Sequence, residues 1–295
     1  MSSSDFSAGG GGAEAAPQSL ADRTGYDELF LGPPVPLPKP AAADVETVIL
    51  PYTHFTVVLR PDRRLAAATA VCIDGQRLLD DVPREDNWRL DPRLPAARQV
   101  GKEVYTDNTL DRGHLVRRLD PVWGERGEAV QANDDTFHFT NAAPQAAVFN
   151  QGKTLWQGLE NYLLDHAAQF DRKLTVFTGP VLHDSDPPYR GMQVPLRFWK
   201  VAAFLQSGAL ASTAYVLDQS PDLTRDADRA FAGAKPGEPP PLGAFRTFQV
   251  PVVDIAELTL LDLGPLPAVD LMPPARAPET RWRRLESHDD IDLGS

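Results

Sequence analysis

Short apolar segments separated by turn signals recur along most of this chain, which is the pattern of an antiparallel sheet. Val45–Leu50 and His54–Arg60 are rich in β-branched and aromatic residues and are divided by Pro51. Leu65–Ile73 ends at Asp74-Gly75, a typical turn dipeptide. The other segments that we expect to be strands are Thr136–Thr140, Leu174–Thr178, Phe198–Leu205, Ser212–Leu217 and Arg246–Val252.

One segment instead has the periodicity of an amphipathic helix. Thr154 and Gln157 have the spacing of a capping box at its start. The apolar positions that follow fall on one helical face: Leu155, Trp156, Leu159, Tyr162 and Leu163. Residues 80–110 are polar, with several proline breaks, and predict a long loop. Many strands with few helices predict an α+β fold with an antiparallel sheet core.

Composition divides the chain into three parts. Residues 1–40 contain a glycine run and a proline-rich stretch, and predict a flexible, extended amino-terminal arm whose apolar middle, Tyr26–Leu31, can dock on the body. Residues 41–265 form the expected folded domain. Residues 266–295 are proline-rich and then mixed in charge, and predict a carboxy-terminal tail.

The overall composition, 42% apolar and 24% charged over 295 residues, is that of a globular protein. Its single cysteine, Cys72, excludes an intramolecular disulfide and a cysteine-rich zinc site. The longest strongly apolar run, Leu65–Ile73, is too short to cross a bilayer, so no membrane partner is expected. No secretory signal pattern opens the sequence, which favours the cytoplasm or export by a route without a signal peptide.

The strongest chemical signal is the tetrapeptide Asp111-Arg112-Gly113-His114. Histidine is the natural general base near neutral pH. Arginine can pair with two phosphate oxygens at once, and glycine allows a ligand to approach the backbone closely. By itself, the tetrapeptide could also be an arginine–aspartate pair beside a surface histidine.

A second group of residues follows this tetrapeptide in a definite order. Thr140-Asn141-Ala142-Ala143-Pro144-Gln145 precedes Asn150-Gln151-Gly152, and then come Trp156 and Leu159-Glu160. Together with Asp111–His114, this succession resembles the DNA/RNA non-specific endonuclease family, whose active site lies on a ββα-metal finger. The resemblance extends over about residues 41–265, including Tyr52–Asp74, Phe177–Pro180 and Leu196–Val201.

The resemblance implies a role for each matching residue. His114 takes the place of the general base that activates water for in-line attack on phosphorus. Asn150 takes the place of the direct magnesium ligand, and Glu160 that of the helix glutamate that holds metal-bound water. Arg112 matches the arginine that contacts the phosphate. Asn141 matches a supporting asparagine with a structural or substrate-contacting role.

Further assignments at this site are less direct. Gln145 is a further candidate for substrate binding, and Asp111 is expected to orient its neighbours. A second family arginine has two candidate positions, Arg84 and Arg89, of which Arg84 is preferred. Asn150 and Glu160 lie ten residues apart rather than the eight expected from the family, which the capping box at Thr154 explains as a longer lead-in to the helix.

The implied metal site agrees with the chemistry of magnesium. Magnesium keeps much of its water shell and needs few protein ligands, and those are oxygen atoms. Asparagine and glutamate supply such oxygens, and manganese is an alternative metal. If one metal ion and one neutral histidine carry the reaction, activity should fall on the acid side as His114 becomes protonated.

Several other residues favour a structural interpretation. His138 lies between Phe137 and Phe139, so alternation favours a hydrogen-bonded, half-buried histidine over a supporting role at the site. Cys72 is expected to be a small buried side chain rather than a nucleophile. Trp123 and Trp199 are expected to pack in the core.

The formal charge, 29 − 41 = −12, argues against binding to nucleic acid unless positive charge gathers locally. The basic run from His114 to Arg118 predicts such a local groove. We therefore interpret the chain as a magnesium-dependent endonuclease acting on DNA and RNA without base recognition, with a homodimer as one arrangement that the resemblance allows. The alternative is a catalytically silent or autoinhibited nucleic-acid-binding or interaction protein of the same fold.

Overall fold

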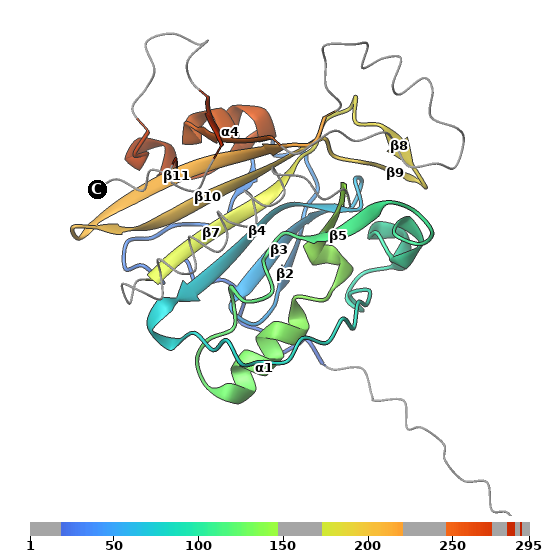
Figure 1. Ribbon diagram of the computed structural model, residues 1–295, viewed down its shortest axis with the longest axis horizontal. Helices are drawn as coiled ribbons and strands as arrows, with labels where there is room; N and C mark the ends of the chain where they lie inside the picture. Colours follow the sequence, from blue (N-terminus) through green and yellow to red (C-terminus); the bar gives the residue numbers. More distant parts are fainter. Residues whose placement is uncertain (1–18, 147–172, 221–245, 273–281, 287–289, 291–295) are drawn as a thin grey trace, which may run out of the picture.

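The computed structural model describes residues 19–146, 173–220, 246–272, 282–286 and 290 (Figure 1). The strands in these ranges are β1 Lys39–Pro40, β2 Val48–Pro51, β3 Phe55–Arg60, β4 Leu65–Asp74, β5 Leu110–His114, β6 Ala142–Ala146, β7 Lys173–Val181, β8 Pro188–Tyr189, β9 Met192–Gln193, β10 Arg197–Gln206, β11 Ala209–Asp218, β12 Arg246–Val250, β13 Leu261–Asp262 and β14 Arg283–Leu285. The helices are α1 Arg126–Asp135 and α4 Val252–Thr259, with 3-10 turns at Gly75–Arg77, Ala96–Arg98, Lys102–Val104, Phe139–Asn141 and Leu266–Val269.

Eight of these strands form one antiparallel sheet in the order β14-β12-β11-β10-β7-β4-β3-β2. Sequence neighbours pair on both sides of the centre, while β4 and β7 join the two halves although they are far apart in the chain (Figure 1). All the expected strands except Thr136–Thr140 coincide with strands of this sheet to within a few residues. The predicted α+β fold class is confirmed.

The sheet is buried on both faces, which explains why its central strands are apolar without a break. Successive side chains of a strand point to opposite faces. In β10, Phe198 belongs to one hydrophobic cluster and Trp199 to the other. The first cluster joins the sheet to β5, β6 and the loop around Val100 and Val104. The second joins it to α4 and to the amino-terminal segment around Leu31.

Gly179 of β7 shows how closely the neighbouring strands β4 and β10 approach it within the sheet. A Cβ atom at this position would lie 2.4 Å from the carbonyl oxygen of Ala67 and 3.0 Å from Nε1 of Trp199, its partner in the register. The Trp199 side chain therefore occupies the space beside Gly179. Glycine is required here because any other side chain would displace a backbone oxygen.

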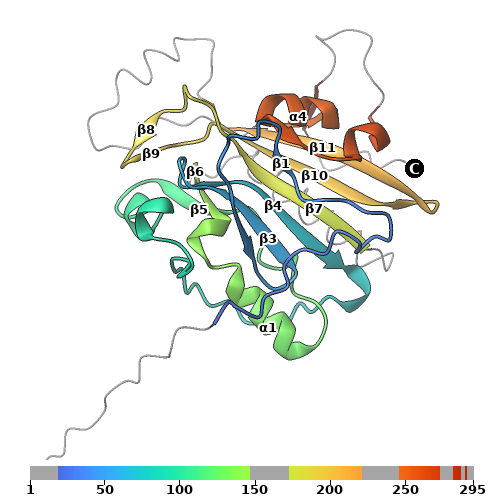
Figure 2. The same cartoon turned by 180° about the vertical axis from the view of Figure 1, so that it is seen from behind.

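Residues 19–40 pack on the body of the protein (Figure 2). Leu31 is 6% and Val35 1% exposed, and the Tyr26 hydroxyl donates to the carbonyl oxygen of Val35 at 2.7 Å. The ring of Tyr26 also lies edge-on against Phe177 at 5.6 Å. The docking expected for Tyr26–Leu31 is therefore observed, and a truncation at residue 40 would remove side chains of the core.

The carboxy-terminal residues in the described ranges also belong to the fold. β14 adds an edge strand to the sheet by pairing with β12, and Leu285 is buried. Leu266 is 1% exposed beneath β11, and the Ser212 hydroxyl donates to its carbonyl oxygen at 2.7 Å. These contacts extend the packed body beyond residue 265.

The expected strand at Thr136–Thr140 is wrong. This segment forms a turn after α1 and then the 3-10 helix Phe139–Asn141, and the strand β6 begins only at Ala142. The Thr136 hydroxyl donates to the carbonyl oxygen of Asn133, and the Asn141 amide donates to that of Thr136. These side chains satisfy backbone groups that a sheet partner would otherwise satisfy.

Neither described α-helix was expected from the pattern. α1 is polar around most of its circumference, with the sequence RGEAVQANDD, and lacks an apolar stripe. α4 begins with the β-branched pair Val252-Val253, which favours a continuation of the strand expected at Arg246–Val252. Its first N–H is capped by Asp270, whose carboxylate accepts from Val252 N at 2.7 Å. The amphipathic helix expected around residues 154–163 lies outside the described residues.

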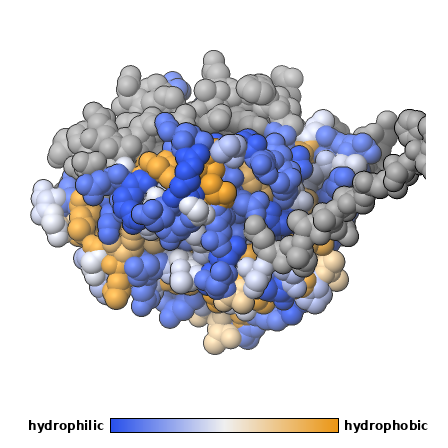
Figure 3. Space-filling model, turned by 90° about the horizontal axis from the view of Figure 1, so that it is seen from below, coloured by the Kyte–Doolittle hydropathy of each residue, from blue (hydrophilic) through white to orange (hydrophobic). Residues whose placement is uncertain are grey.

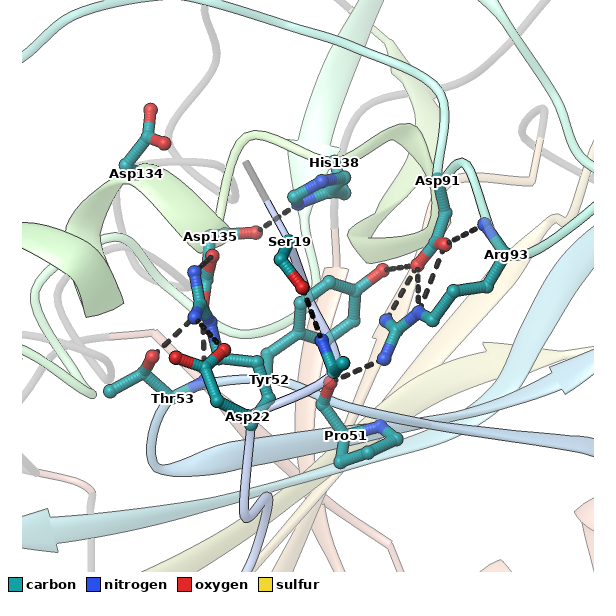
Figure 4. Close-up of polar contacts among 12 residues, drawn as sticks. Ser19, Asp22, Pro51, Tyr52, Thr53, Asp91, Arg93, Asp134, Asp135 and His138 are labelled. Atoms are coloured by element: carbon teal, nitrogen blue, oxygen red, sulfur yellow. Dashed lines mark hydrogen bonds and ion pairs between the residues drawn. The ribbon is translucent and has the colours of Figure 1, made fainter. Parts of the chain in front are cut away.

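A buried carboxylate at the end of α1 ties the amino-terminal segment to the sheet (Figure 4). Asp135 is 0% exposed, and its oxygens accept from Arg23 Nε at 2.7 Å and Nη2 at 3.2 Å. The backbone N–H and hydroxyl of Thr53 also donate to Asp135, at 3.0 and 2.8 Å. The charge is therefore fully paired, as burial requires.

A second buried carboxylate anchors the long loop that precedes β5 (Figure 4). Asp91 accepts hydrogen bonds from the Tyr52 hydroxyl and from the guanidinium of Arg93, which also donates to Pro51 O at 2.7 Å. Burial acts to raise the pKa of Asp91, but the hydrogen bonds from Arg93 and Tyr52 outweigh it and hold the pKa below its usual value. The loop is thus fixed to the start of the sheet.

The face of the molecule seen in Figure 3 is mostly hydrophilic, with hydrophobic side chains in small separate groups. Exposed large hydrophobic residues in the described ranges are scattered over several elements, for example Ile49 on β2 and Val130 on α1. Neither α-helix that the structure describes has the length and apolar character needed to cross a membrane.

Arg23→Ala should destabilise the fold by about 3–5 kcal/mol, because it leaves the Asp135 carboxylate buried without its partner. Urea denaturation followed by circular dichroism measures this loss. Arg60→Ala is the matched control, since the Arg60–Asp62 pair lies at the surface and is worth about 0–1 kcal/mol. Equal effects of the two substitutions would show that Arg23 does not secure the fold.

Candidate active site

Two strands of the expected finger, β5 and β6, form an antiparallel pair in which His114 lies opposite Ala142 and Arg112 opposite Pro144. Residues two apart in a strand share one face, so Arg112 and His114 point to the same side of the pair. The strand conformation of β5 thus brings the candidate phosphate ligand and the candidate base to one side. The helix that would complete a ββα finger lies outside the described residues.

Gln145 belongs to the other face of this pair. It lies opposite Asp111, and a Cβ atom on Gly113 would come within 2.2 Å of the Gln145 Cδ atom. Gly113 is therefore the residue that leaves room for the Gln145 side chain to cross β5. The structure does not bring Gln145 to the side that carries Arg112 and His114.

Asn141 lies completely buried beneath the end of β5. Its Oδ1 accepts from Val116 N at 2.9 Å, and its Nδ2 donates to Val116 O at 3.0 Å and to Thr136 O at 3.1 Å. Its backbone oxygen also accepts from Leu115 N at 2.9 Å. The side chain is thus occupied by backbone groups on both sides, and it fixes where the chain goes after His114.

Aromatic rings surround the imidazole of His114. The Trp88 ring centroid lies 4.7 Å from it, and Phe137 packs edge-on at 5.2 Å. Phe139 continues this layer, 5.6 Å from Trp88 and stacked on Tyr105 at 5.9 Å. The Nε2 atom of His114 is buried and has no hydrogen-bond partner among the residues that the structure describes. A buried polar atom without a partner is costly, and it often marks a catalytic or ligand-binding group.

This environment lowers the pKa of His114 to about 3. Burial is the largest cause, because the charged imidazolium loses its hydration, and the positive charges of Arg84, Arg118 and Arg112 add to it. Asp86 acts in the opposite direction. The imidazole is therefore neutral near pH 7 and able to accept a proton.

Positive charge gathers around the histidine in spite of the acidic total. Arg84 Cζ lies 5.8 Å from the Phe137 ring, Arg112 Cζ lies 5.5 Å from the Trp88 ring, and Arg118 donates to Val82 O at 3.1 Å. Burial lowers the pKa of Arg118, and the nearby charges of Arg84 and Arg117 contribute to this. Guanidinium groups that repel one another in this way form a site where an anion is favourable.

The structure distinguishes the two candidates for the second arginine. Arg84 is exposed and lies beside the Phe137 ring, which packs against His114. Its guanidinium forms an ion pair with Asp86, with 2.8 Å between Nη2 and Oδ1. Arg89 is instead committed to the fold: it donates to Asp134 at 2.7 Å and to His138 Nε2 at 3.2 Å. Only Arg84 is thus placed near His114.

His138 is hydrogen-bonded at both ring nitrogens, with Nδ1 2.9 Å from Asp135 O. Because Nε2 accepts from Arg89, the proton lies on Nδ1 and the ring is neutral. Burial and then the charge of Arg89 lower its pKa. The structural interpretation of His138 is confirmed, although the residue is 1% exposed rather than half-buried. Cys72 and Trp199 are likewise buried in the core.

Asn150 and Glu160 lie outside the described residues, so their positions relative to His114 are not described. Within the described ranges, no three His, Cys, Asp or Glu side chains come together as a metal-binding group. Sequence reasoning did not select Trp88 or Phe137 for this site. The alternation Arg84, Asp86, Trp88 is a signal that could have found Trp88, since all three side chains lie near His114.

A sequence model of the DNA/RNA non-specific endonuclease family matches residues 38–268, and the chain belongs to this family. Nucleases of this family act on nucleic acids. The match covers the β5–β6 pair, all of the candidate site residues and every strand of the large sheet except β14.

The chain is also similar to individual proteins. The chain is 43% identical over 265 residues to the uncharacterized protein y4fB of Sinorhizobium fredii, covering 80% of this chain and 38% of that protein. It is 31% identical over 123 residues to human mitochondrial endonuclease G, covering 42% of this chain and 34% of that protein. The chain thus spans little more than a third of the length of either of these relatives.

The fold is also shared with a solved structure. A crystal structure of an EndoG/EndoGI complex matches with a TM-score of 0.53 and 16% identity, covering 72% of this chain and 84% of that chain. At this identity the likeness concerns the fold alone.

Asn141→Ala should reduce the free energy of unfolding by about 3 kcal/mol, because it leaves three buried backbone groups without partners at about 1–3 kcal/mol each. Urea denaturation measures the loss. Asn87→Ala, in which an exposed amide donates to Glu85, is the control and should stay within about 0.5 kcal/mol of the wild type. A loss of that small size for Asn141→Ala would contradict its structural role.

Proposed function

We propose that this protein is a metal-dependent endonuclease that hydrolyses phosphodiester bonds in DNA and RNA with little sequence preference. The observation that carries the proposal is His114: a neutral imidazole on the same strand face as Arg112 and near three arginines, with a buried Nε2 that has no partner within the described part of the chain. A base beside an anion-binding cluster is what attack of water on a phosphodiester requires.

In this proposal His114 is the general base. It takes a proton from water as the oxygen forms its bond to phosphorus. The bond between phosphorus and the 3′ oxygen breaks, and this oxygen takes a proton from solvent, so the products are a 5′-phosphate and a 3′-hydroxyl. Because the pKa of His114 is depressed to about 3, the imidazole stays neutral through the ordinary histidine range. The expected loss of activity on the acid side therefore begins below that range.

Arg112 and Arg84 bind the phosphate in this scheme. Guanidinium groups fit phosphate oxygens in pairs, and their charge balances the additional negative charge of the five-coordinate transition state. Contacts of this kind recognise the backbone and not the base, which supports action on both DNA and RNA. Asn141 positions the site without contacting substrate, and Gln145 has a supporting place behind Gly113.

Asn150 and Glu160 would hold the metal. Their amide and carboxylate oxygens are the donors that magnesium prefers, and manganese accepts the same set. When bound, the ion would neutralise charge on the phosphate and on the leaving oxygen. A homodimer stays a prediction of the family resemblance.

His114→Ala should abolish cleavage of supercoiled plasmid and of total RNA, with a loss of about 10²–10⁴-fold that corresponds to removal of a general base. Agarose gels with magnesium and with EDTA follow both substrates. His183→Ala is the matched control, because this histidine is exposed on a loop, and it should cut as the wild type does.

The outcomes separate the two candidate functions. Metal-dependent cutting of both substrates that is lost only in His114→Ala supports the proposal. Absence of cutting by the wild type, and by a variant that lacks residues 1–18, would contradict it and favour a catalytically silent nucleic-acid-binding protein. The truncation ends at residue 18 because Leu20 and Arg23 belong to the packed fold.

Arg84→Ala should weaken binding to a short labelled DNA duplex and reduce the slope of log K against log salt concentration by about 1, since one phosphate contact is lost. Fluorescence anisotropy in EDTA measures binding without cleavage. Arg126→Ala is the control, because its side chain is 56% exposed like that of Arg84 and is likewise paired with an aspartate. Identical slopes for Arg84→Ala and wild type would exclude Arg84 as a phosphate ligand.

A further inference from the structure

Trp88 occupies a distinctive place in the loop before β5. Within residues 84–88, the side chains of Arg84, Asp86 and Trp88 lie near His114. The residues between and beside them instead line a separate groove of about 1030 Å³ next to α1; these are Pro83, Glu85, Asn87 and Arg89. The loop therefore has one face at the candidate active site, and Trp88 is the large side chain on that face.

The indole ring of Trp88 connects four groups of the site. It lies 4.7 Å from the His114 ring and packs on Phe137 at 5.4 Å and Phe139 at 5.6 Å. On the same ring, the Arg112 guanidinium lies 5.5 Å from the centroid, within the range of a cation–π contact. A single side chain thus touches both the candidate base and the candidate phosphate ligand.

The backbone next to Trp88 is fixed. Arg89 N donates to Phe137 O at 3.0 Å, and Phe139 N donates to Arg89 O at 2.9 Å, so the loop pairs with the segment that supplies the aromatic floor. The Arg89 side chain adds its ion pair with Asp134. Trp88 is therefore held in place by its neighbours and does not depend on His114 for its position.

We propose that Trp88 is a positioning residue of the active site: its indole fixes the orientation of the His114 imidazole and the Arg112 guanidinium and keeps water from the imidazole. This inference rests on the proposed endonuclease function. An aromatic ring is suited to the task because it offers one apolar face to both groups and has only two side-chain torsions to order.

Loss of the indole has a defined electrostatic consequence. Among the described residues, the charged groups that act most strongly on His114 are Arg84 and Asp86 on the loop, Arg112 on β5 and Arg118 after β5. All of these stay when Trp88 is removed, but the imidazole becomes hydrated, which favours its protonated form. The pKa of His114 therefore rises toward its ordinary value, and the acid limb of the pH–rate profile moves to higher pH.

The test compares Trp88→Ala, Trp88→Phe and Trp88→Leu in the full-length protein, with Trp282→Ala as control. Trp282 also packs on an aromatic ring, Phe248 at 5.7 Å, but it lies at the other end of the chain and outside the candidate site. Circular dichroism and thermal unfolding first establish which variants are folded. Histidine proton titration by NMR, with the His114 signal assigned by its loss in His114→Gln, then reports the imidazole, and plasmid cleavage gives kcat and KM as functions of pH.

For Trp88→Ala and Trp88→Leu we expect a kcat lower by about 10–100-fold with KM changed much less, because misplacement of a reacting group affects the transition state most. Both should also raise the titration midpoint of His114 by at least one pH unit. Trp88→Phe should keep most of the wild-type values, and Trp282→Ala all of them. If Trp88→Ala does not fold, the comparison of Trp88→Leu with Trp88→Phe tests the inference.

A wild-type kcat and an unchanged His114 titration in folded Trp88→Leu would overturn the inference. The NMR readout separates this failure from failure of the proposed function. If no variant, including the wild type, cleaves nucleic acid, the endonuclease proposal fails while the titration still shows whether Trp88 controls the imidazole.

Discussion

The buried amide of Asn141 is the contact on which the geometry of the site depends. Its three hydrogen bonds join the residues that follow His114 to the turn that follows α1, two segments about twenty residues apart in sequence. A side-chain amide can donate two hydrogen bonds through its nitrogen and accept one through its oxygen at the same time, which a carboxylate or a hydroxyl could not do. The end of β5 is thus fixed relative to Phe137 and Phe139, and His114 is held among the aromatic rings as a result.

Burial then determines the chemistry of His114. In water, an imidazole beside arginines would be hydrated in both of its protonation states, and the arginine charges would be screened. Between Trp88 and Phe137 both effects change: desolvation disfavours the imidazolium, and the charges of Arg84, Arg112 and Arg118 act over short distances. A chain with a net charge of −12 can therefore still gather positive charge around one histidine, because the charge that acts at a site is the local one.

The sequence predicts those features that depend on regular periodicity. Strands such as Phe198–Leu205 follow from their apolar runs. The shared face of Arg112 and His114 was not predicted, because it depends on the strand β5, whose sequence LDRGH has no apolar run. The failures occur where side chains replace regular backbone pairing. α1 is polar and is fixed through Asp135, and Thr136–Thr140 looks like a strand until Asn141 and Thr136 bind its backbone groups. Trp88 was not assigned, because its contact with Phe137 joins residues nearly fifty positions apart in sequence and the alternation of Arg84, Asp86 and Trp88 is a weak signal by itself.

Two side chains of the candidate site, those of Arg84 and Trp88, lie on a loop, and this loop is held in place by contacts with the rest of the fold. The loop is anchored at one point by the buried carboxylate of Asp91, which accepts hydrogen bonds from Tyr52 and Arg93. It is anchored at a second point by the backbone pairing of Arg89 with Phe137 and Phe139. Arg84 and Trp88 extend from the anchored side of this segment toward β5. Because both anchors are buried polar contacts, any loosening would leave charges or backbone groups unpaired. The energetic cost of that loss keeps the loop in one conformation, and the arginine and the indole therefore meet His114 in a defined arrangement.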